Sequence, residues 1–284
     1  MRILVAEFAV GTGLTGPIFF EGRAMLNTLV RSFRRIGHEV VSTEGDFRQS
    51  IEDLSKDCDA GLVIAPDDIL HEFTRIIEDN TVNLGCSSSV VRLCADKLRT
   101  SEKLSRAGIS VPRIDSDDCP RYVIKPRYGC ASEDVFVVSD FVQKEGCITT
   151  EYIDGEHLSV SLIIGSSALP LTVNKQLVEI DHRIQYMGGI VPHYVPQWKE
   201  VINAAVKSAQ ILSCTGYVGV DIVLDDKPYV VDVNPRATTS IIGVSRVIDR
   251  EIADLILRAR FGKLPDDVQI SGSYSFTKRE LEAL

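Results

Sequence analysis

The sequence lacks the spacing patterns of zinc sites, disulfide scaffolds and membrane spans. Its five histidines include no H-x-x-x-H pair, and its seven cysteines are odd in number and never spaced C-x-x-C. These features predict free thiols in a reducing cytoplasm. No uncharged apolar run approaches the roughly 18–20 residues that cross a bilayer. Arg2 leads directly into strand-like sequence without a signal-peptide pattern, so we expect a cytoplasmic protein.

The chain also lacks an excess of positive charge. The chain has 31 Lys and Arg residues against 40 Asp and Glu residues, which gives a net charge of −9 and a pI near 5.1. Binding to nucleic acid or to anionic membranes needs a basic surface, so neither is expected as a partner. The oligomeric state stays open, and a homo-oligomer is compatible with the composition.

The first third of the chain alternates strand and helix patterns. Apolar, β-branched runs at 2–8, 38–43 and 59–65 predict buried strands. Helical spacing predicts helices from Glu21 to about His38 and from Asp67 to Asn80. This alternation favours a doubly wound parallel sheet. The expected fold class is therefore α/β with α+β parts, and the tail after about residue 260 is expected to be polar.

The segment GTGLTG, residues 11–16, fits the G-x-G-x-x-G pattern of dinucleotide-binding folds. Such a fold needs a helix to begin at the glycines, whereas Pro17 follows at once and the amphipathic pattern starts around Glu21. Glu44 stands where a ribose-binding acid would be expected. A loop that contacts a substrate is a further alternative, with Glu7 and Glu21 as candidate contacts or as structural carboxylates.

The hairpin at 216–236, GYVGVDIVLDDKPYVVDVNPR, has the most informative pattern. If it is symmetric about residues 226 and 227, Asp221 lies opposite Asp232. Alternation then puts Asn234 on the face of these acids, while the other face is apolar and includes Val231. Opposed like charges destabilise a sheet, so this face favours a bound cation. Hard oxygen ligands in this number suit Mg²⁺ or Mn²⁺.

Two lysines precede this hairpin in suitable contexts for phosphate binding. Lys125 ends a predicted strand and leads into the loop at 127–135, whose small residues could offer backbone donors. Lys97 lies near the start of a predicted helix and could reach the same phosphates, although a single lysine is often only a surface charge. The extended segment Thr150–Ile153 could contact an adenine edge. The acids that follow, Asp154 and Glu156, are candidates for a ribose contact.

Taken in order, these motifs resemble the ATP-grasp superfamily. The resemblance rests on Lys97 in ADK, Lys125 in VIKP, EYIDGEHLSVS, and GVDIVL with VVDVNPR, and it spans essentially the whole chain. It implies a pre-ATP-grasp domain at 1–94, a small lid subdomain at 95–149 and a C-terminal grasp domain at 150–284. The phosphate loop has one glycine, Gly129, only 28 residues separate the two lysines, and the second metal position is an Asp where many relatives have Glu.

The resemblance also implies a role for each matched residue. The expected ATP contacts are Lys97, Lys125, Ser132, Glu151, Tyr152, Ile153 and Glu156. The expected ligands of one or two Mg²⁺ or Mn²⁺ ions are Asp221, Asp232 and Asn234. The expected catalytic residues are Arg236 and Lys125, and the expected substrate contacts are Glu7, Glu21, Lys175, Gly188, Gly189 and Arg236.

The activity implied is formation of an amide by an ADP-forming carbon–nitrogen ligase, through an acyl phosphate, and the partners implied are a small-molecule carboxylate and a small-molecule amine. The EF opening, FEGRAML, and VNKQ followed by Tyr186 to Gly189 are similar to archaeal ligases of methanofuran biosynthesis that join tyramine to L-glutamate. Another acid and amine pair, a dinucleotide-dependent oxidoreductase and a non-catalytic nucleotide sensor are the alternatives.

Overall fold

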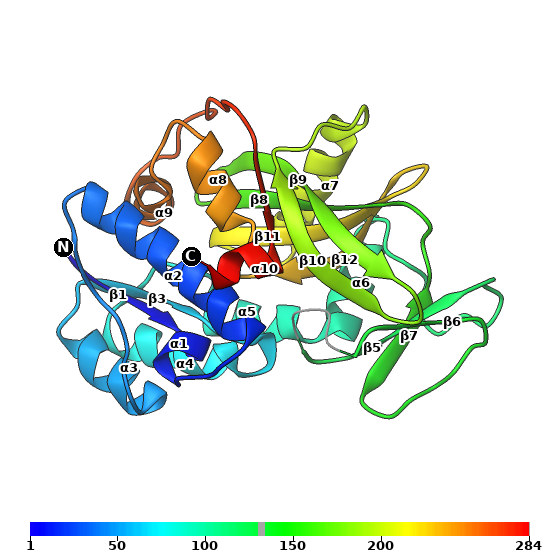
Figure 1. The fold of residues 1–284 in the computed structure, drawn as a ribbon, viewed down its shortest axis with the longest axis horizontal. Coiled ribbons are helices and arrows are strands. Elements are labelled where there is room, and N and C mark those ends of the chain that lie inside the picture. The colour runs from blue at the N-terminus through cyan, green and yellow to red at the C-terminus, as the bar shows by residue number, and fades with distance from the viewer. Residues whose placement is uncertain (130–133, 284) are drawn as a thin grey trace.

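A computed structural model describes residues 1–129 and 134–283 (Figure 1). The chain starts with a parallel sheet at the left of the view, in the order β2-β1-β3-β4. Its strands are β1 (Arg2–Glu7), β2 (Glu39–Val41), β3 (Ala60–Ile64) and β4 (Val82–Asn83). Its helices are α1 (Phe8–Gly11), α2 (Pro17–Arg35), α3 (Phe47–Lys56) and α4 (Asp67–Asn80). The predicted doubly wound parallel sheet is confirmed.

The glycine-rich opening does not form a tight strand-to-helix turn. Gly11 ends the short helix α1, and a β-carbon there would lie 2.4 Å from the Phe47 ring. Helix α2 begins at Pro17, so the predicted start at Glu21 is wrong by a turn. Gly16 is the N-cap residue with φ of +82°, and proline is tolerated at the first helical position because its missing N–H needs no partner there. A dinucleotide fold would turn from the strand into its long helix through these glycines, whereas here the short helix α1 lies between β1 and α2.

A small antiparallel sheet follows, in the order β6-β5-β7, at the lower right of Figure 1. Its strands are β5 (Tyr122–Pro126), β6 (Phe136–Val138) and β7 (Cys147–Glu151). Helices α5 (Ser88–Ala95) and α6 (Lys97–Arg106) precede it and meet at Asp96, whose carboxylate accepts from the N–H of Arg99. The expected division after residue 149 falls within β7.

The C-terminal half forms a six-stranded antiparallel sheet, in the order β12-β11-β8-β9-β10-β13. Its strands are β8 (Glu156–Ile164), β9 (Ala168–Ile180), β10 (Ile184–Val191), β11 (Gly216–Leu224), β12 (Pro228–Asn234) and β13 (Tyr274–Thr277). Its helices are α7 (Trp198–Ile211), α8 (Ile241–Val247), α9 (Ile252–Phe261) and α10 (Lys278–Glu282). The polar tail contains regular structure, because β13 pairs with β10 and α10 packs beside α2 (Figure 1).

Two apolar cores join the beginning and the end of the chain. One contains Leu29 of α2 together with Leu255 of α9. The other contains Phe47 of α3 together with Leu158 and Val220 of the large sheet. The N-terminal sheet is therefore fixed against the large sheet. Within the described residues, none of the helices combines the length and the apolar character that crossing a membrane requires.

Candidate active site

A cavity of about 560 Å³ lies where the three sheets meet. Its walls come from the carboxyl ends of β1 and β3, from α2, from the small sheet and from the hairpin β11–β12. Most of the residues singled out in the sequence line it together. They are Glu7, Glu21, Lys97, Lys125, Glu151, Tyr152, Ile153, Asp221, Asp232, Asn234 and Arg236. Ser132 lies outside the described residues.

The hairpin pairs Asp221 with Asp232, as its symmetry predicts. Beyond this pair the register shifts, and Ile222 pairs with Val230. This bulge turns Val230 into the apolar core and leaves Val231 lining the cavity, so the predicted faces of these two valines are wrong. The shift lies on the turn side of the acids and leaves their pairing intact.

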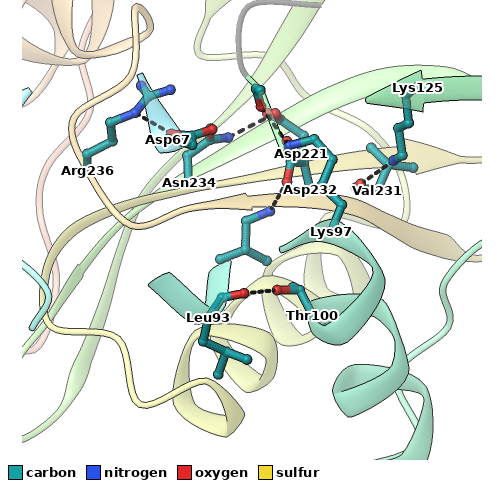
Figure 2. Close-up of polar contacts among 12 residues, drawn as sticks. Asp67, Leu93, Lys97, Thr100, Lys125, Asp221, Val231, Asp232, Asn234 and Arg236 are labelled. Atoms are coloured by element: carbon teal, nitrogen blue, oxygen red, sulfur yellow. Dashed lines mark hydrogen bonds and ion pairs between the residues drawn. The ribbon is translucent and has the colours of Figure 1, made fainter. Parts of the chain in front are cut away.

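The two facing carboxylates differ in their tendency to ionise. Burial, followed by the negative charge of Asp232, raises the pKa of Asp221 to about 7. Burial acts in the same direction on Asp232, but the charges of Lys97 and Lys125 outweigh it and lower the pKa of Asp232 below its usual value. Asn234 Nδ2 donates to Asp221 Oδ2 at 3.0 Å (Figure 2). The pair therefore concentrates negative charge that a cation would relieve.

The donor set of this face suits a hard divalent cation. It offers two carboxylates and one amide oxygen from adjacent strands. Residues 1–129 and 134–283 contain no group of three or more His, Cys, Asp or Glu side chains that could hold a metal ion. A site with so few protein ligands fits Mg²⁺, which commonly binds one or two carboxylates and completes its shell with phosphate oxygens and water.

Lys97 links α6 to the acidic face. Its Nζ lies 3.0 Å from Asp232 Oδ2 and donates to the backbone oxygen of Gly129 at 2.9 Å. Thr100 Oγ1 donates to Leu93 O at 2.9 Å, which holds α6 against α5 (Figure 2). Lys97 is therefore held between the hairpin and the start of the phosphate loop.

Lys125 reaches the hairpin from the small sheet. Its Nζ donates at 2.9 Å to the backbone oxygen of Val231, the residue left unpaired by the bulge (Figure 2). Burial lowers the pKa of Lys125 to about 8, although the charge of Asp232 acts in the opposite direction. A buried ammonium group of this kind gains from an anion, because the anion compensates the charge that burial disfavours.

Arg236 is fixed by an acid that sequence reasoning missed. Its Nε donates to Asp67 Oδ1 at 2.8 Å, and Asp67 is buried in the first turn of α4 (Figure 2). Asp67 begins a helix, where acids are common for reasons of the helix dipole. Nothing in its local pattern indicated a partner 169 residues away.

Glu21 also has a partner from a distant part of the chain. Lys278 Nζ of α10 lies 2.9 Å from Glu21 Oε1, and Thr239 Oγ1 donates to Glu21 Oε2 at 3.0 Å. Lys278 lines the cavity beside Tyr186, but it lies in the tail, for which the sequence predicted only polar character. No local signal identified it.

Four expected site residues do not line the cavity. Glu156 accepts from Lys175 Nζ at 2.8 Å and lies 2.9 Å from His193 Nε2. Strand alternation instead places His157 at the cavity, so the expected ribose contact of Glu156 and substrate contact of Lys175 are not supported by their positions.

Gly188 and Gly189 serve the packing of the large sheet. A β-carbon at Gly188, where φ is +151°, would lie 2.1 Å from the backbone oxygen of Phe276 in β13. Gly189 pairs with Phe276 in the same ladder. The close approach of β13 explains the glycines, and a substrate contact at these positions is not supported.

Comparisons with known proteins agree with this geometry. Residues 94–240 match the family described as ATP-grasp domain, and residues 25–91 match the pre ATP-grasp 3 domain. The chain is 32% identical to the tyramine–L-glutamate ligase of Methanocaldococcus fervens, over 90% of this chain and 93% of the relative. It is 30% identical to the ligase of the same name from Methanocaldococcus jannaschii, over 90% and 88%. A crystal structure of an ATP-grasp superfamily protein from Archaeoglobus fulgidus aligns with a TM-score of 0.81 and 31% identity, covering 94% of this chain and 90% of that one.

Proposed function

Because the chain belongs to the ATP-grasp superfamily and is an ADP-forming carbon–nitrogen ligase, we propose that it joins the γ-carboxylate of L-glutamate to tyramine. The proposal is supported by the names of the two relatives, which align along nine-tenths of this chain. The observation that carries it is one cavity with two kinds of wall. Lys97, Lys125 and Arg236 supply positive charge, and α2 supplies apolar side chains and one acid, Glu21.

The chemistry divides into two steps. A carboxylate oxygen of the donor acid attacks the γ-phosphorus of ATP, which gives an acyl phosphate and ADP. The amine nitrogen then attacks the acyl carbon, and the bond to the phosphate oxygen breaks. Positioning and electrostatic stabilisation account for most of the catalysis in phosphoryl transfer, so no protein nucleophile is needed.

Different residues of the chain have different roles in the first step. Lys97 and Lys125 bind and orient the phosphates, and their charges compensate the negative charge that builds up there. Arg236, held by Asp67, orients the acyl phosphate. Asp221, Asp232 and Asn234 would hold Mg²⁺ or Mn²⁺. When bound, such an ion neutralises phosphate oxygens and helps to align the transferred group.

The direct test supplies the purified protein with ATP, Mg²⁺, L-glutamate and tyramine, and follows ADP and the coupled product by mass. We expect one γ-glutamyl-tyramine per ADP, and no ADP release when either substrate is omitted. ADP release only with another acid and amine would refute the substrates and leave the ligase class intact.

A matched pair of hairpin variants tests the role of the acidic face. Asp232→Asn should abolish product formation because it removes a carboxylate from the acidic face of the cavity. Asp226→Asn makes the same chemical change at the exposed turn of the same hairpin and should retain activity. Equal activity of the two variants would contradict the assignment of Asp232.

A further inference from the structure

Five carboxylates line the cavity, and four of them have evident tasks. Asp221 and Asp232 form the acidic face of the hairpin. Glu151 pairs with Arg113 through Nε at 3.1 Å, and Glu21 pairs with Lys278. The fifth carboxylate is Glu7, at the end of β1, and the reaction as described above gives it no role.

Glu7 is buried at the cavity wall without a matching cation. Its side chain is 5% exposed, and Oε2 accepts from the backbone N–H of Val10 at 2.8 Å. Among the described residues, no Lys, Arg or His nitrogen lies within 4.0 Å of its carboxylate. A β-carbon at Gly22 would lie 2.4 Å from this carboxylate, so the glycine of α2 leaves the space that Glu7 occupies. The fold thus accommodates a buried acid next to the substrate space.

The amide-forming step needs a proton acceptor. A primary alkyl amine is almost entirely protonated at neutral pH, like a lysine side chain with its pKa of about 10.4. Its nitrogen has no lone pair for attack until a proton leaves. The acidic face and the paired acids are committed to cations, which leaves Glu7 as the cavity carboxylate suited to this transfer.

We propose that Glu7 accepts the proton of the amine substrate and so generates the neutral nucleophile. This inference rests on the proposed function, since it assigns a residue to the second step. The ammonium group gives one proton to Glu7, and the neutral nitrogen attacks the acyl carbon. As the carbon–oxygen bond to phosphate breaks, the nitrogen loses its second proton to the departing phosphate, which leaves as hydrogen phosphate. Glu7 then returns its proton to water.

The surroundings of Glu7 suit a proton acceptor near neutral pH. Burial raises its pKa to about 7, while the backbone N–H groups of Val10 and Ala9 and the charge of Arg236 act in the opposite direction. Among the charged groups of the neighbouring elements, Glu21 of α2, Lys278 of α10 and Asp67 of α4 are already ion-paired. A base with a pKa near the working pH is the most effective in general acid–base catalysis.

The wall next to Glu7 indicates the class of amine. Pro17, Ile18 and Met25 of α2 and Ile64 of β3 line the same cavity. Burial of a ring against such a surface is favourable at ~25 cal/mol per Å² of apolar area. The expected acceptor is therefore a primary amine with an apolar or aromatic tail, whose ammonium group reaches Glu7.

The test compares two nucleophiles in wild type and Glu7→Gln. Hydroxylamine is neutral at pH 7 and traps the acyl phosphate as a hydroxamate without needing a base, whereas tyramine needs one. At pH 7 we expect Glu7→Gln to lower the tyramine-dependent rate by about 10²-fold or more and to leave hydroxamate formation within about twofold of wild type. Glu200→Gln, at an exposed position of α7, is the matched control and should behave as wild type in both reactions.

The pH profile separates a proton acceptor from a structural acid. The wild-type rate with tyramine should level off above pH 7, whereas the rate of Glu7→Gln should continue to rise by about tenfold per pH unit as free amine accumulates. Equal losses with both nucleophiles, or a wild-type rate with tyramine, would overturn the inference. If wild type itself forms no hydroxamate from L-glutamate, the proposed donor fails instead, and the comparison is repeated with the acid that does react.

Discussion

Replacing Gly22 by alanine tests the packing of Glu7 against α2. In an ordinary helix interior this change stabilises by ~1 kcal/mol, because alanine is the better helix former. Here the new β-carbon would lie 2.4 Å from the Glu7 carboxylate, which is buried and accepts from the Val10 N–H. Either the carboxylate moves, or the helix moves away from β1.

Both ways of relieving the contact cost free energy. Displacing Glu7 removes an N-terminal cap of α1, worth ~1 kcal/mol. Crowding in a packed interior adds ~1–3 kcal/mol. Against the helix gain, we expect the free energy of unfolding to fall by ~1–3 kcal/mol, and each kcal/mol lowers Tm by ~2–4 °C for a protein of about this size.

A double-mutant cycle gives the decisive measurement. In a Glu7→Ala background the contact is absent, so Gly22→Ala should raise Tm by a few degrees instead of lowering it. The two sites should therefore be coupled by at least ~1 kcal/mol. Thermal denaturation of the four proteins measures this directly. If Gly22→Ala raises Tm equally in both backgrounds, the tight packing of Glu7 on α2 is refuted.

Three further predictions concern pH, a positioning acid and the metal. The pKa of Glu7 is raised to about 7 from 4.5, so the folded state holds this proton more tightly than the unfolded chain, and stability falls as pH rises through that window. Between pH 5 and pH 8 the Tm of wild type should therefore fall relative to the Tm of Glu7→Gln. A difference in Tm that stays constant over this range would contradict this. Asp67→Asn should lower kcat by about 10²-fold through misplacement of Arg236, whereas Asp68→Asn at the exposed neighbour should not, and steady-state kinetics compares the two. Chelation of divalent ions by EDTA should stop ADP release, and added Mg²⁺ should restore it; persistent turnover in EDTA would exclude a metal role for the hairpin.

Local sequence patterns predicted the part of the site that lies on the hairpin β11–β12. The pairing of Asp221 with Asp232 follows from a short turn and strict alternation, and both are visible in the sequence. The bulge that exchanges Val230 and Val231 is not visible, because both residues are valine and either register buries one of them. The start of α2 at Pro17 was missed because the first turn has no amphipathic pattern.

Contacts between distant segments could not be predicted. The pairs Arg236–Asp67 and Glu21–Lys278 join residues whose own neighbourhoods suggest only a helix start and a charged surface. Strand β13 is four residues long, and its pattern is too short to stand out from a polar tail. Such a strand exists because the open edge of β10 offers it a ladder.

The docking of β13 and α10 also bears on the order in which the enzyme becomes competent. The cavity needs Glu7 from β1 and Lys278 from α10, so its wall is incomplete until β13 has paired with β10. A chain shortened before Tyr274 would keep most of both apolar cores and still lack this wall. Loss of activity would therefore precede loss of the fold when residues are removed back through α10 and β13.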